Sequence, residues 1–301
     1  MPDFNSALPP NELSILAGAS GAGKSTLVIQ AIGAWSQGLP FLGITPSTPR
    51  RFGYLAADRG VSSIRDHAIR GKVNINSLPI CSLVDDINLD LSQLQAHPLK
   101  MLLKIVDSLL DKGAQLVVID PLMIFLGSDL NRYHLVAPPL IQLNRYCKQR
   151  GVTLLGIHHT TKARSDFAFL RPQDRISGSS ALSAFTSTQW ALWAAEELPD
   201  AQREQGLSRL DIISHTAAPE VLWMRRQNGL FSPAGPQPGE LGSIPHLILS
   251  VLSTGDPLPA GTLIQALAAE ASRASVYRAL DMLVAGGLVI QPSRGLYQKT
   301  S

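Results

Sequence analysis

Gly18-Ala19-Ser20-Gly21-Ala22-Gly23-Lys24-Ser25 follows the pattern G-x-x-x-x-G-K-[ST], in which a glycine-rich turn points its backbone N–H groups at phosphate. An apolar run at 12–17 precedes this stretch, and a helical segment at 26–35 follows it. Strand, turn and helix in this order are the context that the motif requires, whereas a chance match to a glycine-rich turn would not need them. We predict that the chain binds a nucleoside triphosphate, ATP by default, through these eight residues and Thr26.

The motif also assigns chemistry to two of its side chains. Lys24 is expected to reach the β- and γ-phosphates, and the Ser25 hydroxyl is expected to ligate Mg²⁺. The N-terminus of the following helix adds a partial positive charge beside the phosphates. ATP and Mg²⁺ are therefore the expected ligands.

Further apolar runs predict a sheet around this loop. The run at 115–120 is continuous, which is typical of a parallel strand buried on both faces. The other predicted strands and helices lie, in chain order, at 51–58, 77–83, 99–112, 136–150 and 152–158. Pro138 and Pro139 are expected in the first turn of their helix, where a missing N–H costs little. Strands separated by helices predict an α/β fold with a mostly parallel, doubly wound sheet, closed by an antiparallel edge at 207–214 and 221–225.

The end of the chain is patterned separately. Residues 230–242 carry three prolines and three glycines, the composition of a linker. Three helical stretches and two short strands follow, which predicts a winged helix. We therefore expect a nucleotide-binding domain at 1–231, a linker at 232–242 and a winged-helix domain at 243–301.

Composition is that of an ordinary globular protein. The 301 residues are 45% hydrophobic and 16% charged, and the net charge of +3 permits a nucleic-acid partner without requiring one. Cys81 and Cys147 are too few for a disulfide framework or a zinc site. The first ten residues do not resemble a secretion signal, and no apolar segment approaches the length of a membrane span. A cytoplasmic protein is expected.

Two aspartates at predicted strand ends are the expected acidic groups of the site. Asp120 closes the apolar run at 115–120, the position of the carboxylate that holds Mg²⁺ in P-loop ATPases. Asp58 ends the strand at 51–58 and is the candidate for polarising the attacking water. The alternatives are a capped strand terminus for Asp120 and a solvated turn for Asp58, which stands beside Arg59 and Gly60.

His158 and His159 follow the predicted strand that begins at residue 152. A polar side chain at this position can hydrogen-bond the γ-phosphate and transmit its loss to the loop beyond. Adjacent strand residues point to opposite faces, so only one histidine can face the phosphate. Ordinary core or surface histidines are the alternative.

The segment at 160–177 is long, polar and without strand pattern. Basic side chains bind nucleic-acid phosphates and aromatic side chains stack on bases, so this segment is a candidate single-stranded DNA loop. A solvated surface loop is the alternative. The candidate contacts are Lys162, Arg164, Phe167 and Arg171, with Phe169 and Arg175 nearby.

The C-terminal domain has a candidate recognition helix that begins near Ser272. Arg273, Tyr277 and Arg278 are its candidate contacts with a partner. Residues 243–301 carry four basic and three acidic side chains, which is little positive charge for binding duplex DNA. Duplex DNA and a protein therefore both remain possible partners of this domain.

Together these residues resemble the RecA-like hexameric replicative helicases, most closely those of the plasmid RepA type. The likeness spans about residues 12–231. It rests on the phosphate loop, Tyr54-Leu55-Ala56-Ala57-Asp58, Val117-Val118-Ile119-Asp120, His158-His159, Gly178-Ser179-Ser180-Ala181 and Trp223-Met224-Arg225-Arg226. The histidine pair followed by Gly-Ser-Ser is the part that points to this family.

The resemblance implies a ring of six subunits with ATP held between neighbours. An arginine of the adjacent subunit would complete each site, and central loops would grip single-stranded DNA. Asp58 stands where the family has glutamate, and Ser177 stands where it has arginine, so the arginine acting in trans is left open among Arg175, Arg225 and Arg226.

Three functions are compatible with this reading. The first is an ATP-driven DNA helicase or translocase. The second is a RecA-like recombination or regulatory ATPase that binds DNA without unwinding it. The third is an ATP-switched regulator that binds DNA through its winged helix. This function stays an alternative because Asp58 has a shorter side chain than the glutamate of the family.

Overall fold

The chain forms two compact units in the computed structural model. The model describes residues 3–71, 73–75, 77–86, 90–127, 132–160, 180–198, 200–234, 243–252, 256–268, 271–285 and 288–300. One unit comprises Met1–Val221 with Arg226–Phe231, and the other comprises Leu222–Arg225 with Ser232–Ser301. Each unit is described by itself.

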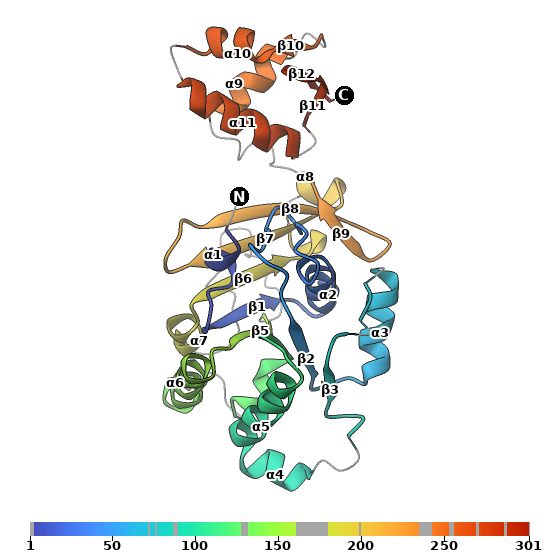
Figure 1. The fold of residues 1–301 in the computed structure, drawn as a ribbon, viewed down its shortest axis with the longest axis vertical. Coiled ribbons are helices and arrows are strands. Elements are labelled where there is room, and N and C mark those ends of the chain that lie inside the picture. Colours follow the sequence, from blue (N-terminus) through green and yellow to red (C-terminus); the bar gives the residue numbers. More distant parts are fainter. Residues whose placement is uncertain are drawn as a thin grey trace. The chain divides into compact units, whose positions relative to one another are not determined.

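The main sheet has nine strands in the order β3-β2-β4-β5-β1-β6-β7-β8-β9 (Figure 1). From β3 to β6 all neighbours pair in parallel, and β7 pairs antiparallel with β6. The sheet is therefore mostly parallel, as the sequence predicts. Its strands are β1 (Leu13–Gly18), β2 (Phe52–Ala56), β3 (Ile80–Ser82), β4 (Leu116–Asp120), β5 (Thr153–His159), β6 (Thr188–Trp193), β7 (Leu207–Ser214), β8 (Glu220–Gln227) and β9 (Leu230–Pro233).

Helices cover both faces of this sheet. On one face, Leu13, Ile15 and Ala17 of β1 share a buried core with side chains of α5 (Pro98–Asp111), α6 (Tyr133–Arg150) and α7 (Ser180–Phe185). On the other face, Trp35 of α2 (Lys24–Trp35) stacks on Phe52 at 6.4 Å between ring centroids. Burial on both faces explains why β1, β2 and β4 are completely buried and nearly continuous in apolar sequence.

The remaining elements of this unit are short or lie at its periphery. The helix α3 follows β2, and the turn η1 follows β4. In chain order they are α1 (Phe4–Ala7), α3 (Val61–Arg70), α4 (Leu91–Ala96), η1 (Leu122–Phe125), η4 (Ala195–Glu197) and α8 (Asp200–Glu204). Among the described residues no helix is both long enough and apolar enough to cross a bilayer.

The structure differs from the sequence prediction in several places. Pro138 and Pro139 lie inside α6, because this helix begins at Tyr133 and not near residue 136. The strand β6 and the helix α3 were not predicted; β6 supplies one of the two parallel neighbours of β1. The expected linker composition begins at residue 230, yet Leu230–Pro233 forms the edge strand β9. A proline is tolerated at such an edge because no neighbour needs its N–H.

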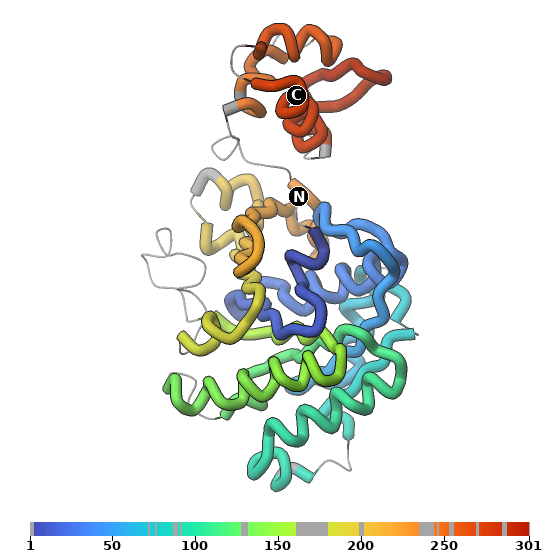
Figure 2. The backbone as a smooth tube through the Cα atoms, turned by 60° about the vertical axis from the view of Figure 1, so that its left-hand side comes forward, coloured from blue at the N-terminus to red at the C-terminus, as the bar shows by residue number. Residues whose placement is uncertain are grey.

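The second unit contains α9 (Ser243–Val251), α10 (Ala260–Ala266) and α11 (Arg273–Ala285). A small sheet of order β10-β12-β11 accompanies them, formed by Leu258–Pro259, Leu296–Lys299 and Val289–Ser293. Figure 2 follows the chain through the helices and into the β11–β12 hairpin. Buried residues from all three helices, including Ile248, Leu263 and Leu280, form a core of their own. The expected order of helices and hairpin is present, with β10 as an additional strand.

Candidate nucleotide site

The glycine-rich loop follows β1 and leads directly into α2. Gly21 has φ +80° and Gly23 has φ +97°, the left-handed region that side chains other than glycine rarely adopt. Gly23 also caps α2, which begins at Lys24. The loop therefore has the strand–turn–helix geometry of a phosphate cradle at a helix N-terminus.

A hairpin from the far end of the sheet closes over this loop. A Cβ atom on Gly23 would lie 2.8 Å from the ring of Phe231 in β9. Gln30 of α2 holds this strand, because its side chain accepts from Phe231 N at 2.8 Å and donates to Phe231 O at 3.1 Å. Arg226 Nη1 donates to Gly21 O at 3.0 Å. Gly23 is thus required both for its backbone angle and for this close approach.

The Lys24 side chain folds toward the start of its own loop. Its ammonium donates to Gly18 O and Ala19 O at 2.8 Å each, and only 6% of the residue is exposed. Burial lowers the pKa of Lys24 from 10.5 to about 8, although the Asp120 carboxylate opposes this shift. A buried cation whose hydrogen-bond partners are uncharged favours an anion at the same place.

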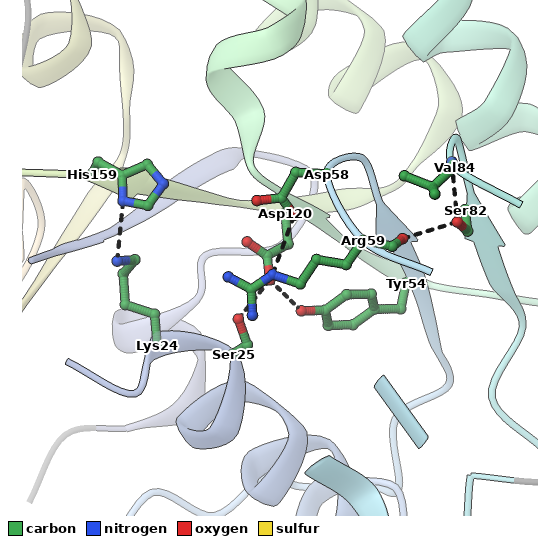
Figure 3. A network of polar contacts seen from close by, with 9 residues as sticks. All are labelled: Lys24, Ser25, Tyr54, Asp58, Arg59, Ser82, Val84, Asp120 and His159. Carbon is green, nitrogen blue, oxygen red and sulfur yellow. Dashed lines mark hydrogen bonds and ion pairs between the residues drawn. The ribbon is translucent and has the colours of Figure 1, made fainter. Parts of the chain in front are cut away.

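Asp120 joins the loop to the neighbouring strands. Its Oδ2 atom accepts from Ser25 Oγ at 2.7 Å and from the phenol of Tyr54 at 2.6 Å (Figure 3). The phenol is completely buried, and burial together with the Asp120 charge raises the pKa of Tyr54 well above its usual value. The phenol therefore stays a donor and fixes the carboxylate.

The Ser25–Asp120 pair fits Mg²⁺. Hydroxyl and carboxylate oxygens are the hard ligands this ion prefers, and it is commonly held by one or two carboxylates plus substrate phosphates. Among the described residues no group of three or more His, Cys, Asp or Glu side chains could hold a metal by itself. This donor set thus suits an ion that arrives with the nucleotide.

Asp58 lies just beyond β2, at the same edge of the sheet. Its side chain is about one-third exposed and its Oδ1 lies 3.4 Å from Arg59 Nε. Burial lowers the pKa of Lys24 and of His159, and the nearby Asp58 carboxylate opposes both shifts. The Asp58 carboxylate thus lies at the edge of the sheet where the parallel strands β1, β4 and β5 also end, and its role in polarising water stays a prediction.

The two histidines of β5 point to opposite faces. His159 Nδ1 lies 3.4 Å from Lys24 Nζ (Figure 3), and this nitrogen must accept because an ammonium can only donate. Burial and the Lys24 charge lower the pKa of His159, which keeps the ring neutral. His158 is buried on the other face, the side on which Gly156 contacts Leu122 of η1. His159 is therefore the histidine that faces the phosphate loop.

A second histidine reaches the loop from α3. Thr26 Oγ1 lies 3.0 Å from His67 Nδ1, and Arg70 Nη2 lies 3.2 Å from the same nitrogen. Because the guanidinium can only donate, Nδ1 accepts and the ring is held as a base. Burial and the Arg70 charge lower the pKa of His67. The hydrogen bond between Thr26 and His67 therefore connects α2 to α3.

The three arginines proposed to act in trans differ in position. Arg226 contacts its own phosphate loop and lies over the Phe231 ring, 5.6 Å from its centroid, so a trans role would require it to leave these contacts. Arg225 is exposed. Arg175 lies outside the described residues, as do the predicted DNA contacts Lys162, Arg164, Phe167 and Arg171.

Sequence reasoning missed three groups in this site: Tyr54, Arg59 and His67. Tyr54 was interpreted only as part of a strand. A tyrosine in an apolar strand next to the strand that ends in Asp120 could have indicated a hydrogen bond to that carboxylate. Arg59 was read as the neighbour that makes Asp58 an ordinary turn residue. His67 carried no signal, because α3 was not predicted.

The lowered pKa of Lys24 predicts a pH-dependent affinity for nucleotide. Lys24 loses its charge as pH rises through about 8, and a bound triphosphate would favour the charged form, so binding takes up a proton. Affinity for a fluorescent ATP analogue should fall about tenfold between pH 7 and pH 9 at saturating Mg²⁺. Titrations at pH 7, 8 and 9 measure this change.

A constant affinity across this range would contradict a phosphate contact through the Lys24 ammonium. Lys24→Arg is the control, because a guanidinium remains charged at every pH used. Its affinity should be lower overall but nearly independent of pH. His67 and His159 do not contribute, since both have lowered pKa values and stay neutral above pH 7.

Comparison with known proteins agrees with this geometry. Residues 4–165, more than half of the chain, match the family model AAA_25, described as an AAA domain. No curated protein matches the sequence. The structure resembles the ATPase domain of G40P, with a TM-score of 0.54 and 11% identity over 74% of this chain and 84% of that one. It also resembles the KaiC-like protein PH0186 from Pyrococcus horikoshii OT3, with a TM-score of 0.50 and 11% identity over 76% and 95% of the two chains.

At this level of identity the structural likeness concerns the fold alone. The family match covers β1, the phosphate loop, β2, β4 and β5, and so includes Lys24, Ser25, Asp58, Asp120 and His159. The chain therefore belongs to the AAA domain family represented by AAA_25, and it is a P-loop ATPase with a RecA-like fold.

Proposed function

We propose that this ATPase is a DNA helicase or translocase of the RepA-like replicative type, acting on single-stranded DNA. One observation carries the proposal. Thr160, the first residue of the basic and aromatic segment 160–177, donates its backbone N–H to Gly18 O at 3.2 Å. Its neighbour His159 contacts Lys24. A change at the γ-phosphate can therefore reach the segment proposed to bind DNA within one residue.

The proposed hydrolysis assigns one task to each group at the sheet edge. Lys24 would bind the β- and γ-phosphates, and Ser25 and Asp120 would hold Mg²⁺, which would neutralise negative charge on the phosphates. Asp58 orients the attacking water and accepts its proton. The water oxygen bonds to the γ-phosphorus while the bond to the bridging oxygen breaks, and the electron pair leaves with ADP. When the γ-phosphate leaves, His159 loses its proposed contact with it and keeps the contact with Lys24 that the structure shows.

The proposal includes a homo-hexameric ring with ATP between subunits. Arg225 and Arg175 are the proposed sources of an arginine from the neighbouring subunit, since Arg226 already contacts its own loop. An arginine supplied in this way would stabilise negative charge on the γ-phosphate in the transition state. The mass of the assembly with ATP and Mg²⁺ in solution, together with negative-stain images, measures ring formation.

The C-terminal unit is proposed to be a winged helix that brings the motor to duplex DNA or to a protein. Its support is the arrangement of α9, α10 and α11 followed by the β11–β12 hairpin. Arg273, Tyr277 and Arg278 lie on α11, and the Arg273 guanidinium lies over the Tyr277 ring, 5.8 Å from its centroid. Arg278 is exposed, and its guanidinium donates to Ala274 O and to Ser275 Oγ of the same helix at 3.4 Å each.

The decisive experiment measures ATP hydrolysis with and without single-stranded DNA, and strand separation on a forked duplex. We expect DNA to stimulate hydrolysis and ATP to drive separation. Stimulation without separation, with filaments on DNA in micrographs, would replace the proposal by the recombination or regulatory ATPase. Negligible hydrolysis with saturable duplex binding would favour the ATP-switched regulator.

A further inference from the structure

Arg59 sits on a turn whose backbone is fixed by the end of β3. Ser82 Oγ donates to Arg59 O at 2.9 Å and accepts from Val84 N at 3.2 Å (Figure 3). Next to it, Val61 N donates to Asp85 Oδ2 at 2.6 Å. The backbone position of this residue is therefore set by several contacts, while 40% of its side chain is exposed.

The Arg59 side chain is directed into the nucleotide site. Its Nε lies 3.4 Å from Asp58 Oδ1, and Figure 3 shows the guanidinium reaching toward Ser25 and Asp120. Burial is the main cause of the lowered pKa of Lys24, His67 and His159, and the Arg59 charge adds to it; for Tyr54, whose pKa burial raises, the Arg59 charge opposes the shift. These four groups belong to α2, β2, α3 and β5. The Arg59 guanidinium is therefore near groups of four different elements that meet at the nucleotide site.

Two cations close together are unfavourable unless an anion lies between them. Lys24 is already buried against neutral carbonyls, so the charge of Arg59 adds to the cost of its ammonium. Asp58 and Asp120 balance these two charges in the free site. Bound Mg²⁺ would add two positive charges, and a triphosphate would supply the negative charge that then balances the site. A guanidinium also has the planar pair of donors that suits phosphate oxygens.

We propose that Arg59 is a further catalytic residue that binds the γ-phosphate of the nucleotide held by its own chain. When the triphosphate enters, the guanidinium moves from Asp58 to the γ-phosphate oxygens and leaves the carboxylate free to orient water. This inference rests on the proposed hydrolysis of ATP. It differs from the trans-acting arginine, because Arg59 follows Asp58 directly in sequence and lies in the same site.

The first test compares Arg59→Ala with the wild-type chain in binding ATPγS and ADP. Only ATPγS carries a γ-phosphate, so the variant should lose about 10- to 100-fold in affinity for ATPγS and much less for ADP. Arg59→Lys should recover part of the loss, since it restores charge without the bidentate geometry. Arg65→Ala, an exposed position on α3, is the matched control and should bind both nucleotides as the wild type does.

An equal loss for the two nucleotides would overturn the proposal, because it would show that Arg59 only supports the fold of the turn. Unchanged affinity for ATPγS would overturn it as well. If the wild type hydrolyses ATP and Arg59→Ala has the same kcat, Arg59 has no catalytic role although the proposed hydrolysis stands. If the wild type neither binds nor hydrolyses ATP, both proposals fail.

A mixing experiment separates action in cis from action in trans. Lys24→Ala chains keep Arg59 but have a defective loop, and Arg59→Ala chains keep the loop. If Arg59 acts on its own chain's nucleotide, mixing the two leaves turnover at the level of Arg59→Ala alone. Recovery of turnover on mixing would show that Arg59 serves a neighbouring subunit, which contradicts the proposal.

Discussion

Lys24→Ala is expected to reduce ATP turnover by about 10²–10³-fold or more. The ammonium is the only group of the loop that brings full positive charge to the β- and γ-phosphates, and its burial makes that charge effective. Alanine leaves Gly18 O and Ala19 O without this donor, but it also removes the cost of burying a cation. Release of inorganic phosphate at saturating ATP and Mg²⁺ measures the loss.

The fold of this variant should remain intact. Its thermal midpoint without nucleotide is expected within about 5 °C of the wild type. Added ATP should raise the midpoint of the wild type and have much less effect on the variant. Turnover equal to the wild type in a folded variant would refute the assignment of residues 18–26 as the nucleotide site.

Asp120→Asn is expected to lower turnover by at least about 10²-fold. The amide oxygen can still accept from Ser25 and Tyr54, so the shape of the site survives. The negative charge that would hold Mg²⁺ does not survive. The variant should therefore need a higher Mg²⁺ concentration for half-maximal turnover, which a magnesium titration at fixed ATP measures.

Tyr54→Phe is the matched control for Asp120→Asn. It removes the phenol donor at 2.6 Å but keeps the carboxylate charge, so turnover should fall by no more than about tenfold. A larger loss in Tyr54→Phe than in Asp120→Asn would show that the phenol, and not the carboxylate, is the essential group. It would contradict the role of Asp120 as the metal ligand.

The parts of the fold with strong local signals could be predicted from the sequence. The stretch at 115–120 is continuously apolar between its polar ends and that at 152–158 is largely apolar, because both faces of the sheet are covered; they correspond to β4 and β5. The strand β6 was missed although Thr188–Trp193 is completely buried. Its sequence, TQWALW, mixes polar and apolar residues, and its place beside β1 depends on partners far along the chain.

The start of α6 shows the same limit. Two prolines usually mark the first turn of a helix, and the sequence was read in that way. The helix begins at Tyr133 instead, and the side chains of Val136, Ala137 and Leu140 are buried in the core around the prolines. Tertiary packing thus outweighs the local cost of the missing N–H groups.

By itself the sequence determined the strand, glycine-rich turn and helix at 13–35, the aspartate at the end of β4 and the α/β class, because each depends on residues adjacent in the chain. Only the tertiary structure decided that His159 faces Lys24, that Tyr54 holds Asp120, that Phe231 covers Gly23 and that Arg59 points into the site. These contacts depend on the order of strands in the sheet, and that order is set by packing between distant segments, which local periodicity does not encode.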